Sequence, residues 1–293
     1  MYLVTGGAGF IGSNLISYLN SLGINDILLI DDLTRSEKIN NIKDLQFEDY
    51  LDWEDTFNDI EDYDITHIFH CGGISSTAEQ DGRKLMKKNF DYSTRLFAWA
   101  YGNQITVKYT SSASIYGKTF HPSKESDPLM ALNPYAYSKL MVEKYLETHH
   151  HSVLSYRLFN VYGKREEHKI SIDQASPVTK FIRQAEDTGV VKLFQGSHSI
   201  YRDFICVDDV VKIMVHLERE PGSYNLGTGK ATSFADVAYA VCEVHDARVE
   251  YIPFPDDLSP RYQYYTCADM TKLNTAHEFI GVLDYIRGLG VNG

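Results

Sequence analysis

The sequence lacks three features that would assign it to other classes of protein. No apolar run comes near the roughly 20 residues that a helix needs to span a bilayer. No pair of cysteines has Cys-x-x-Cys or zinc spacing, so we expect reduced thiols and no metal site. Basic residues are fewer than acidic ones, with 28 Lys and Arg against 40 Asp and Glu. The net charge of −12 argues against nucleic acid and anionic membrane as general partners.

The chain also lacks internal repeats, low-complexity tracts and an exposed linker. Its 293 residues are enough for one large α/β unit or two closely joined lobes. The first residues enter a predicted strand at once, which leaves no room for a signal peptide. We therefore expect a cytoplasmic protein.

Short apolar runs alternate with helical patterns in the first half of the chain. The predicted buried strands are Tyr2–Thr5, Ile27–Asp31, His67–Cys71, Val107–Ser111 and Val153–Leu158. The predicted helices between them are Ile11–Leu22, Lys84–Tyr101 and Ala136–His149. This alternation predicts an α/β fold, a Rossmann-type doubly wound parallel sheet.

The second half is less regular, with further strand signals at Asp203–Val207 and Ser223–Leu226 that suggest a return to the sheet. We therefore expect a smaller α/β substrate-binding domain interleaved with the first. The dinucleotide-binding domain is predicted to comprise residues 1–158 with about 203–226 and 267–280. The substrate-binding domain is predicted to comprise residues 159–202, 227–266 and 281–293.

A glycine-rich turn follows the first strand and opens the first helix. Gly7, Gly9 and Gly12 satisfy Gly-x-Gly-x-x-Gly, and Gly6, Gly9 and Gly12 satisfy the shifted form. Such glycines permit a tight turn and close approach of the backbone to a pyrophosphate at the helix N-terminus. Asp31, about 20 residues on, is placed for a ribose hydroxyl. The pattern predicts a dinucleotide site, with a structural glycine turn as the alternative.

The residues leave the choice between NAD and NADP open. The Asp31 carboxylate favours NAD, because it repels a 2′-phosphate. Arg35 and Lys38 follow closely and could pair with that phosphate, or remain solvated. Further along, the small residues of Cys71-Gly72-Gly73 would let a cofactor lie against the backbone.

Tyr135 and Lys139 stand four residues apart on a predicted helix, so their side chains share one face. The ammonium can stabilise a phenolate and lower the pKa of Tyr135, which could then take a proton from an alcohol while a nicotinamide takes the hydride. Ser112 closes the preceding strand and can hydrogen-bond the same alcohol. Chance spacing on an amphipathic helix and a serine-rich turn are the alternatives.

Together these motifs resemble those of the extended short-chain dehydrogenase/reductase family over nearly the whole chain. Within that family the sequence is similar to the ADP-L-glycero-D-manno-heptose 6-epimerases. Segments that carry this similarity include Ile68–His70, Ser75–Thr77, Phe159–Gly163, Phe194–Ser197, Arg202–Phe204, Asn225–Gly229 and Tyr251–Pro255. The resemblance implies an NADP-dependent, redox-neutral inversion at C6 of a heptose, in lipopolysaccharide core synthesis.

The resemblance also implies roles for particular residues. Catalytic roles fall to Ser112, Tyr135, Lys139 and Lys169. Cofactor contacts fall to Gly6, Gly9, Phe10, Ile11, Gly12, Asp31, Asp32, Lys38, Cys71, Gly72, Gly73, Ile74, Ser75, Asn89 and Val161, and again to Tyr135, Lys139 and Lys169. Substrate contacts fall to Ser76, Asn160, Ser171, Lys180, Phe194, Gln195, Gly196, Ser197, Arg202 and Tyr262. The sequence departs from the family pattern at Trp53, Lys88 and Lys180, which stand for a Lys, an Asn and a His.

The implied chemistry explains why two acid/bases would be needed. No carbonyl acidifies the C–H bond at C6, so transient oxidation to a ketone is required. Hydride return to the opposite face needs proton transfer from two sides, which suits Tyr135 and Lys169. Lys169 could instead be a surface or phosphate-binding lysine. Arg202 could hold a diphosphate through two parallel hydrogen bonds.

Three other functions compete with this one. A 4-epimerase remains open and would not need Lys169. A 4,6-dehydratase is disfavoured, because Ala113 follows Ser112 where such enzymes place an acid. A non-catalytic dinucleotide sensor is disfavoured by the retained Tyr135 and Lys139. We expect a sugar nucleotide as substrate and a homo-oligomeric assembly.

Overall fold

The computed structural model describes residues 1–149, 151–172, 174–255 and 262–290. The chain forms two compact units, which are described separately. Unit 1 comprises Met1–Ser112, Pro134–Arg157 and Val211–Tyr224, and unit 2 comprises Ala113–Asn133, Leu158–Val210 and Asn225–Gly293. Within the described ranges, no helix has the length and apolarity to cross a membrane.

Unit 1 is built on a seven-stranded sheet of order β10-β6-β5-β4-β1-β2-β3. The strands are β1 (Tyr2–Thr5), β2 (Ile27–Asp31), β3 (Asp49–Asp52), β4 (His67–His70), β5 (Val107–Ser112), β6 (Val153–Leu158) and β10 (Gly222–Leu226). Strand β1 pairs in parallel with both β2 and β4, and Thr5 lies level with Ile30 and His70. The loops that follow β1, β2 and β4 therefore leave the same edge of the sheet, where ligands bind in open α/β sheets.

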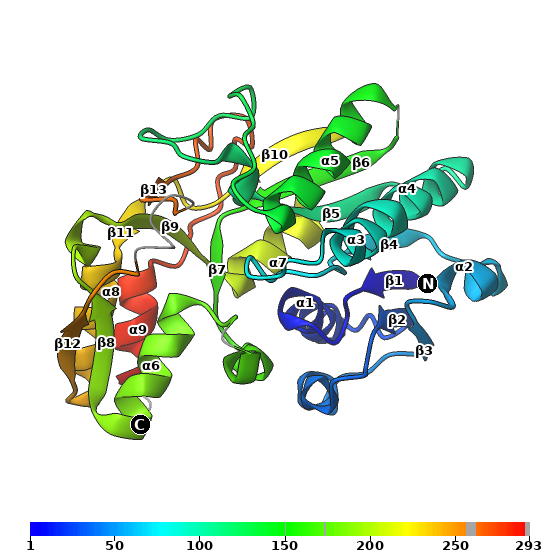
Figure 1. Ribbon diagram of the computed structural model, residues 1–293. Helices are drawn as coiled ribbons and strands as arrows, with labels where there is room; N and C mark the ends of the chain where they lie inside the picture. Colours follow the sequence, from blue (N-terminus) through cyan, green and yellow to red (C-terminus); the bar gives the residue numbers. More distant parts are fainter. Residues whose placement is uncertain (150, 173, 256–261, 291–293) are drawn as a thin grey trace. The chain divides into compact units, whose positions relative to one another are not determined.

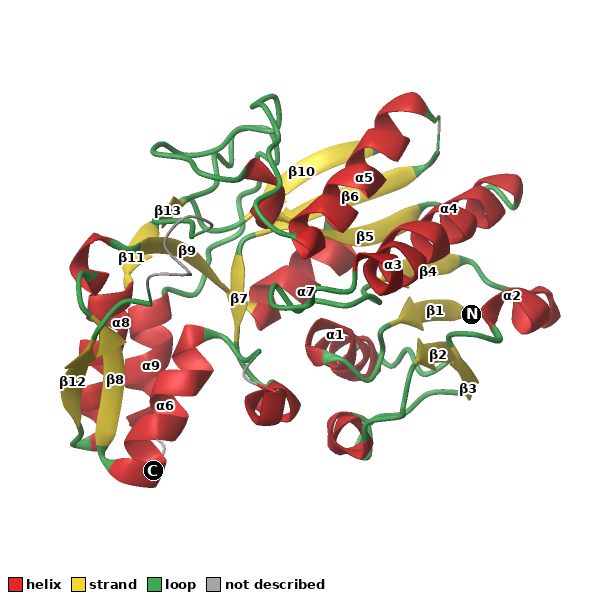
Figure 2. Cartoon of the chain, viewed as in Figure 1, coloured by secondary structure: helices red, strands yellow, loops and turns green. Residues whose placement is uncertain are grey.

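Helices flank this sheet (Figures 1 and 2). They are α1 (Phe10–Ser21), α2 (Thr56–Asp59), α3 (Gly82–Leu85), α4 (Tyr92–Gly102), α5 (Pro134–Thr148) and α7 (Val207–His216), the last beginning in unit 2. The strands form because their apolar runs are buried on both faces, as in β2, where every residue is buried. Leu3, Leu28, Ile68, Phe97 and Val107 belong to one hydrophobic cluster.

One helix differs from its sequence-based expectation. Residues 84–101 were predicted to form a single helix, but a π-helical segment, Met86–Asp91, stands between α3 and α4. A π-turn shifts the side chains that follow it around the helix, and such turns are frequent at functional sites. This one carries Lys87, Lys88 and Asn89.

Unit 2 contains two smaller sheets. Strand β9 (Tyr201–Cys206) pairs with β7 (Asn160–Tyr162), β11 (Ala231–Ser233) and β13 (Tyr265–Thr266), and β8 (Val190–Phe194) pairs in parallel with β12 (Arg248–Ile252). Its helices are α6 (Pro177–Thr188), α8 (Phe234–His245) and α9 (Val282–Gly290). Ser176 and Ser233 cap α6 and α8 by accepting the amides of Thr179 and Asp236.

The predicted α/β fold with its mostly parallel sheet is confirmed, and Ser223–Leu226 lies in the large sheet as expected. The expectation that Asp203–Val207 returns to that sheet is wrong, since β9 is built into unit 2. Residues 113–133 and 267–280 also group with unit 2, unlike the predicted bounds. These two segments group together because their backbones pair: Ser123 N donates to the Cys267 carbonyl, and Asp269 N donates to the Ser123 carbonyl. Which domain binds which ligand stays a prediction.

Candidate active site

The turn after β1 is so close to neighbouring backbone that only glycine fits at some of its positions. Gly6 has a φ of +66°, and a Cβ there would lie 2.7 Å from the Cα of Gly72. A Cβ on Gly12 would lie 2.9 Å from the Cα of Gly7. The N-cap of α1, Gly9, has no side chain to bond the first amides of the helix. Phe10 and Ile11 open the helix, so these backbone amides fit the pyrophosphate of a dinucleotide.

The Asp31 carboxylate at the end of β2 is already engaged within the protein. It is 6% exposed, and its Oδ2 accepts the amide of Ala8 at 2.8 Å. Its Oδ1 accepts Lys38 Nζ at 2.6 Å. Asp31 therefore fastens the glycine turn, and Lys38 compensates the charge that would repel a 2′-phosphate. A carboxylate has about four lone-pair sites, so a ribose hydroxyl can still be accepted.

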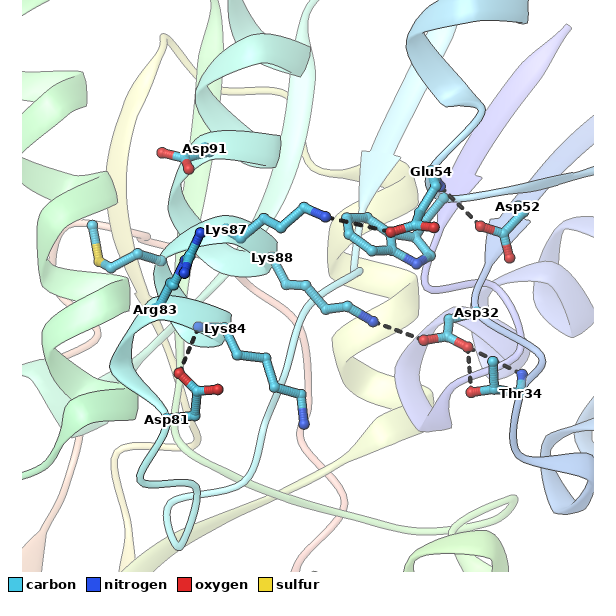
Figure 3. A pocket seen from close by; sticks show the side chains of 12 residues that line it. Asp32, Thr34, Asp52, Glu54, Asp81, Arg83, Lys84, Lys87, Lys88 and Asp91 are labelled. Carbon is cyan, nitrogen blue, oxygen red and sulfur yellow. Dashed lines mark hydrogen bonds and ion pairs between the residues drawn. The ribbon is translucent and has the colours of Figure 1, made fainter.

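Beyond Asp31 lies a pocket of about 770 Å³. Its lining residues are Asp32, Thr34, Asp52, Trp53, Glu54, Asp81, Arg83, Lys84, Met86, Lys87, Lys88 and Asp91 (Figure 3). Lys88 points at Asp32, with Nζ 2.7 Å from Oδ2, and lies 4.3 Å from the Trp53 ring centroid. Burial alone would raise the pKa of Asp32, but hydrogen bonds from Lys88 and Thr34 hold it well below its usual value.

The loop after β4 is fixed by Asn89 from the π-helical segment. The Asn89 side chain is 1% exposed; its Oδ1 accepts the amide of Ile74 at 2.7 Å, and its Nδ2 donates to the Ile74 carbonyl and to Ser138 Oγ. Gly73 has a φ of +140°, and a Cβ there would lie 2.9 Å from Asn89 Oδ1. Burial raises the pKa of the Cys71 thiol to about 12, so this group is neutral. Gly72, Gly73 and Ser75 thus present backbone and small side chains beside α5.

Three of the four predicted catalytic residues lie in unit 1. Tyr135 is 9% exposed and shares a side-chain hydrogen bond with Ser112. Lys139 is 5% exposed, and burial lowers its pKa to about 8 against the attraction of Cys71 and Glu143. Its Nζ donates to Tyr109 Oη at 3.0 Å and to the Thr110 carbonyl at 2.9 Å.

The pKa of Tyr135 differs from the expectation based on spacing. Lys139 was expected to lower it, but burial raises it, with only the bond to Ser112 acting in the other direction. The physical reason is that the Lys139 ammonium donates hydrogen bonds to β5, at Tyr109 and Thr110. Tyr135 is therefore a neutral phenol in this state of the protein.

The fourth predicted catalytic residue, Lys169, lies in unit 2 on a 3-10 helix, Glu167–Ile172. Burial lowers its pKa, and the nearby Glu166 carboxylate opposes that shift. Glu166 is 2% exposed and accepts hydrogen bonds from Ser176 N, Ser176 Oγ and Thr179 Oγ1 at 2.7–2.8 Å. Burial raises the pKa of Glu166 and Lys169 lowers it. A partly buried lysine beside a carboxylate has the adjustable charge that an acid/base needs.

Arg202 and a row of aromatic rings lie together in unit 2. The Arg202 side chain is 7% exposed on β9, with its guanidinium 5.2 Å from the Tyr262 ring and 5.4 Å from the Phe234 ring. Tyr262 contacts Phe254, which contacts Phe194 at the end of β8. Among the described residues no carboxylate forms an ion pair with Arg202. This arrangement suits a flat base and a diphosphate.

The other predicted substrate residues are placed separately. Ser76 is buried in a turn, where its Oγ accepts the Ala78 amide. Asn160 and Val161 lie on β7, Lys180 lies on α6, and Gln195, Gly196 and Ser197 form the turn after β8. The side chain of Ser171 lies outside the described residues. The sequence reasoning missed Tyr109, although a tyrosine inside a buried strand that ends at Ser112 was a usable signal.

The parallel sheet, the glycine cradle and the group of Ser112, Tyr135 and Lys139 are together typical of a dinucleotide-dependent enzyme. Residues 2–227 match the NAD dependent epimerase/dehydratase family, and the chain belongs to it. The predicted enzyme class, an isomerase of the epimerase type, is thereby confirmed. A nicotinamide dinucleotide is the cofactor class.

Individual relatives are more specific. The chain is 42% identical to the ADP-L-glycero-D-manno-heptose-6-epimerase of Alkalilimnicola ehrlichii, over 94% of this chain and 91% of the relative. It is 40% identical to the protein of that name from Brachyspira hyodysenteriae, with the same coverages. The crystal structure of the Helicobacter pylori ADP-L-glycero-D-manno-heptose-6-epimerase superposes with a TM-score of 0.87 at 25% identity, covering 99% of this chain and 94% of that one. The predicted resemblance is confirmed.

Proposed function

We propose that the protein epimerises ADP-glycero-manno-heptose at C6, through a transient 6-keto sugar and with tightly bound NADP. The observation that carries this proposal is the 42% identity, over nearly the whole chain, to a relative of that name. The product would serve lipopolysaccharide core synthesis. A cytoplasmic location and assembly into a homo-oligomer stay predictions.

The residues of unit 1 suit the oxidation of an alcohol. When bound, a nicotinamide dinucleotide supplies the hydride acceptor and donor. As a phenolate, Tyr135 takes the proton of the C6 hydroxyl, and Ser112, its hydrogen-bond partner, holds the same oxygen. Lys139 brings a positive charge that stabilises the phenolate which Tyr135 forms.

The residues of unit 2 suit the second proton transfer and the nucleotide. Lys169 is assigned as the second acid/base, because burial already lowers its pKa toward neutrality. Arg202 is assigned to the diphosphate, since its buried guanidinium has aromatic neighbours and about five N–H donors. One of these donors goes to the Tyr201 carbonyl at 2.9 Å. Tyr262 is assigned to the base or sugar.

NADP is favoured over NAD by the charges around β2. Lys38 neutralises Asp31 and Lys88 neutralises Asp32, so neither carboxylate presents an uncompensated charge to a 2′-phosphate. Calorimetric titration of cofactor-free protein with both nucleotides tests this choice. NAD binding at least tenfold tighter would assign the site to NAD.

The function itself is tested with purified protein and ADP-heptose of either C6 configuration. We expect proton NMR to follow conversion of each epimer into the same mixture, without added reductant. Tyr135→Phe provides the inactive reference. Turnover of a UDP-hexose at C4, with ADP-heptose left unchanged, would replace this proposal by a 4-epimerase.

A further inference from the structure

We propose that Tyr109 is a positioning residue for Lys139, whose ammonium it holds at the end of β5 through its hydroxyl oxygen. Tyr109 does not touch the substrate in this proposal; it acts on the charge of Lys139. The inference rests on the proposed role of Lys139, and its decisive measurement does not require a substrate.

The contact has two parts. Tyr109 is fully buried, and its oxygen accepts Lys139 Nζ at 3.0 Å. The same ammonium lies 4.6 Å from the Tyr109 ring centroid, within range of a cation–π attraction. A second donor goes to the Thr110 carbonyl at 2.9 Å. An ammonium has three donors, so one remains for the phenolate of Tyr135 or a cofactor hydroxyl.

A buried chain of hydrogen bonds orients the His70 ring, on which the ring of Tyr109 stacks. Ser93 Oγ donates its single hydrogen to the Asn89 carbonyl at 2.6 Å, so it can only accept from its other partners. One such partner is His70 Nε2 at 2.8 Å, which therefore donates to Ser93. Burial raises the pKa of Tyr109 well above its usual value, and a hydrogen bond with Ser93 acts in the other direction. Tyr109 is therefore a neutral phenol, and its oxygen accepts from Lys139.

The ring of Tyr109 is fixed in the same way. It stacks on His70, with centroids 5.1 Å apart, and meets the edge of Phe97 at 5.4 Å. Because His70 Nε2 must donate to Ser93, His70 Nδ1 accepts Thr5 Oγ1 at 2.5 Å. Burial lowers the pKa of His70 to about 3, so this ring stays neutral. The oxygen that faces Lys139 is thus held by several elements of unit 1.

The charge of Lys139 depends on every titratable group that faces it. These groups are Cys71, His70, Tyr109, Tyr135 and Glu143. Burial favours the neutral amine, whereas the Glu143 carboxylate favours the ammonium. The Tyr109 oxygen also favours the ammonium, since it accepts a hydrogen bond from it. Removal of that oxygen must lower the pKa of Lys139 further.

The test is Tyr109→Phe in full-length protein labelled with ¹³Cε-lysine. The Cε resonance of Lys139 is assigned by its absence in Lys139→Met, and its pH titration gives the pKa without any substrate. We expect the midpoint to fall by about 1 to 2 pH units, the equivalent of one hydrogen bond to a charged group. Tyr156→Phe is the matched control, because Tyr156 is fully buried and its hydroxyl has no partner among the described residues.

An unchanged Lys139 midpoint in a folded Tyr109→Phe variant would overturn the proposal. So would an equal shift in Tyr156→Phe. If the Phe variant does not fold, Tyr109→Met removes hydroxyl and ring together and must give a larger shift in the same direction. Should the protein turn over ADP-heptose, the alkaline limb of kcat/KM must move to lower pH with the resonance. Absence of turnover would count against the proposed function and leave the titration valid.

Discussion

Two buried polar residues of unit 1, His70 and Lys139, differ in whether they carry a charge. His70 is neutral because burial lowers its pKa to about 3, while Lys139 keeps a pKa of about 8 in the same interior. Most of this difference is intrinsic, because an imidazole starts from 6.5 and an ammonium from 10.5. Their partners add to it. His70 lies between two hydroxyl groups, which satisfy a neutral ring, whereas Lys139 has the attraction of Glu143. The sequence suggested a role for Lys139 and none for His70 beyond the family resemblance.

His70 should make the stability of the protein sensitive to weak acid. A lowered histidine pKa means that the unfolded state binds more protons below about pH 6.5. The free energy of unfolding should therefore decrease as the pH is lowered from about 6.5 to about 3. The slope should approach roughly 1.4 kcal/mol per pH unit. Urea denaturation between pH 7 and pH 5 measures it. His70→Asn should lose that part of the slope, and the exposed His121→Asn should keep it. Equal slopes in both variants would contradict the assignment.

Tyr135→Phe should abolish most turnover and leave the fold intact. Only one hydroxyl is removed, and with it the proposed base, so kcat should fall by roughly 10²–10⁴-fold. Cofactor affinity and the thermal midpoint should change little. The control is Tyr137→Phe on the same helix, where the side chain is 50% exposed. A Tyr135→Phe enzyme with near-normal rates would remove Tyr135 from the mechanism.

At the scale of elements, α5 is anchored by one buried ion pair. Glu143, one turn beyond Lys139, accepts Arg157 Nη2 from β6 at 2.8 Å and the hydroxyls of Ser155 and Ser223 at 2.6 Å. Glu143 and Arg157 are 1% and 3% exposed. The helix that carries Tyr135 and Lys139 is thereby tied to the sheet by charge as well as by packing.

Glu143→Ala should destabilise the protein by about 3–5 kcal/mol, because it leaves the Arg157 charge buried without its carboxylate. Denaturation midpoints at pH 7 measure the loss. Joint replacement, Glu143→Leu with Arg157→Leu, should recover most of it, since no buried charge remains. The exposed Glu186→Ala breaks a surface pair with Arg183 and should change stability by less than about 0.5 kcal/mol. A loss in the double variant as large as in Glu143→Ala would show that packing, rather than charge, holds α5.

Arg202→Ala should raise KM for the sugar nucleotide far more than it weakens cofactor binding. The guanidinium would lose a charge-assisted bond worth roughly 1.5–3 kcal/mol, equivalent to about 10- to 150-fold in KM. Steady-state kinetics together with cofactor titration measure both quantities. Arg183→Ala serves as the control, because its side chain is exposed on α6. If KM were unchanged, Arg202 would lie outside the substrate site.

The elements that sequence predicted best are those whose pattern does not depend on distant partners. Strands β1, β2 and β6 match their predicted bounds, and every residue of β2 and β6 is buried. The π-turn at Met86–Asp91 left no trace in the periodicity, because one extra residue per turn changes the pattern too little. The location of β9 was missed because its strand signal fits either sheet, and only its pairing with β7, β11 and β13 decides.

At the scale of the whole molecule, the chain alternates between its two units, and the proposed catalytic and substrate-binding groups divide between them. Ser112, Tyr135 and Lys139 belong to unit 1, and Lys169 and Arg202 belong to unit 2. Spacing in the sequence found the first group, since Tyr135 and Lys139 stand on one helix. The second group came from family resemblance, because no local pattern links Lys169 to Arg202, 33 positions along the chain.

Lys169→Met should separate the two halves of the proposed reaction. The variant retains Ser112, Tyr135 and Lys139, so one C6 epimer should still be oxidised or reduced at a normal rate. Conversion between epimers should fall by roughly 10²–10⁴-fold, as expected for loss of one acid/base. Tyr135→Phe should show the opposite preference between epimers.

A dismutation assay with a heptose 6-aldehyde analogue exposes each half-reaction of Lys169→Met. Lys180→Met is the matched control, because Lys180 lies on α6 and is assigned only to substrate binding. Loss of the Lys180 side chain should raise KM and leave the ratio of the two half-reaction rates unchanged. If Lys169→Met behaves in that same way, Lys169 is a substrate contact. The two-base mechanism would then give way to a single acid/base, because one residue would have to serve both faces of the C6 ketone.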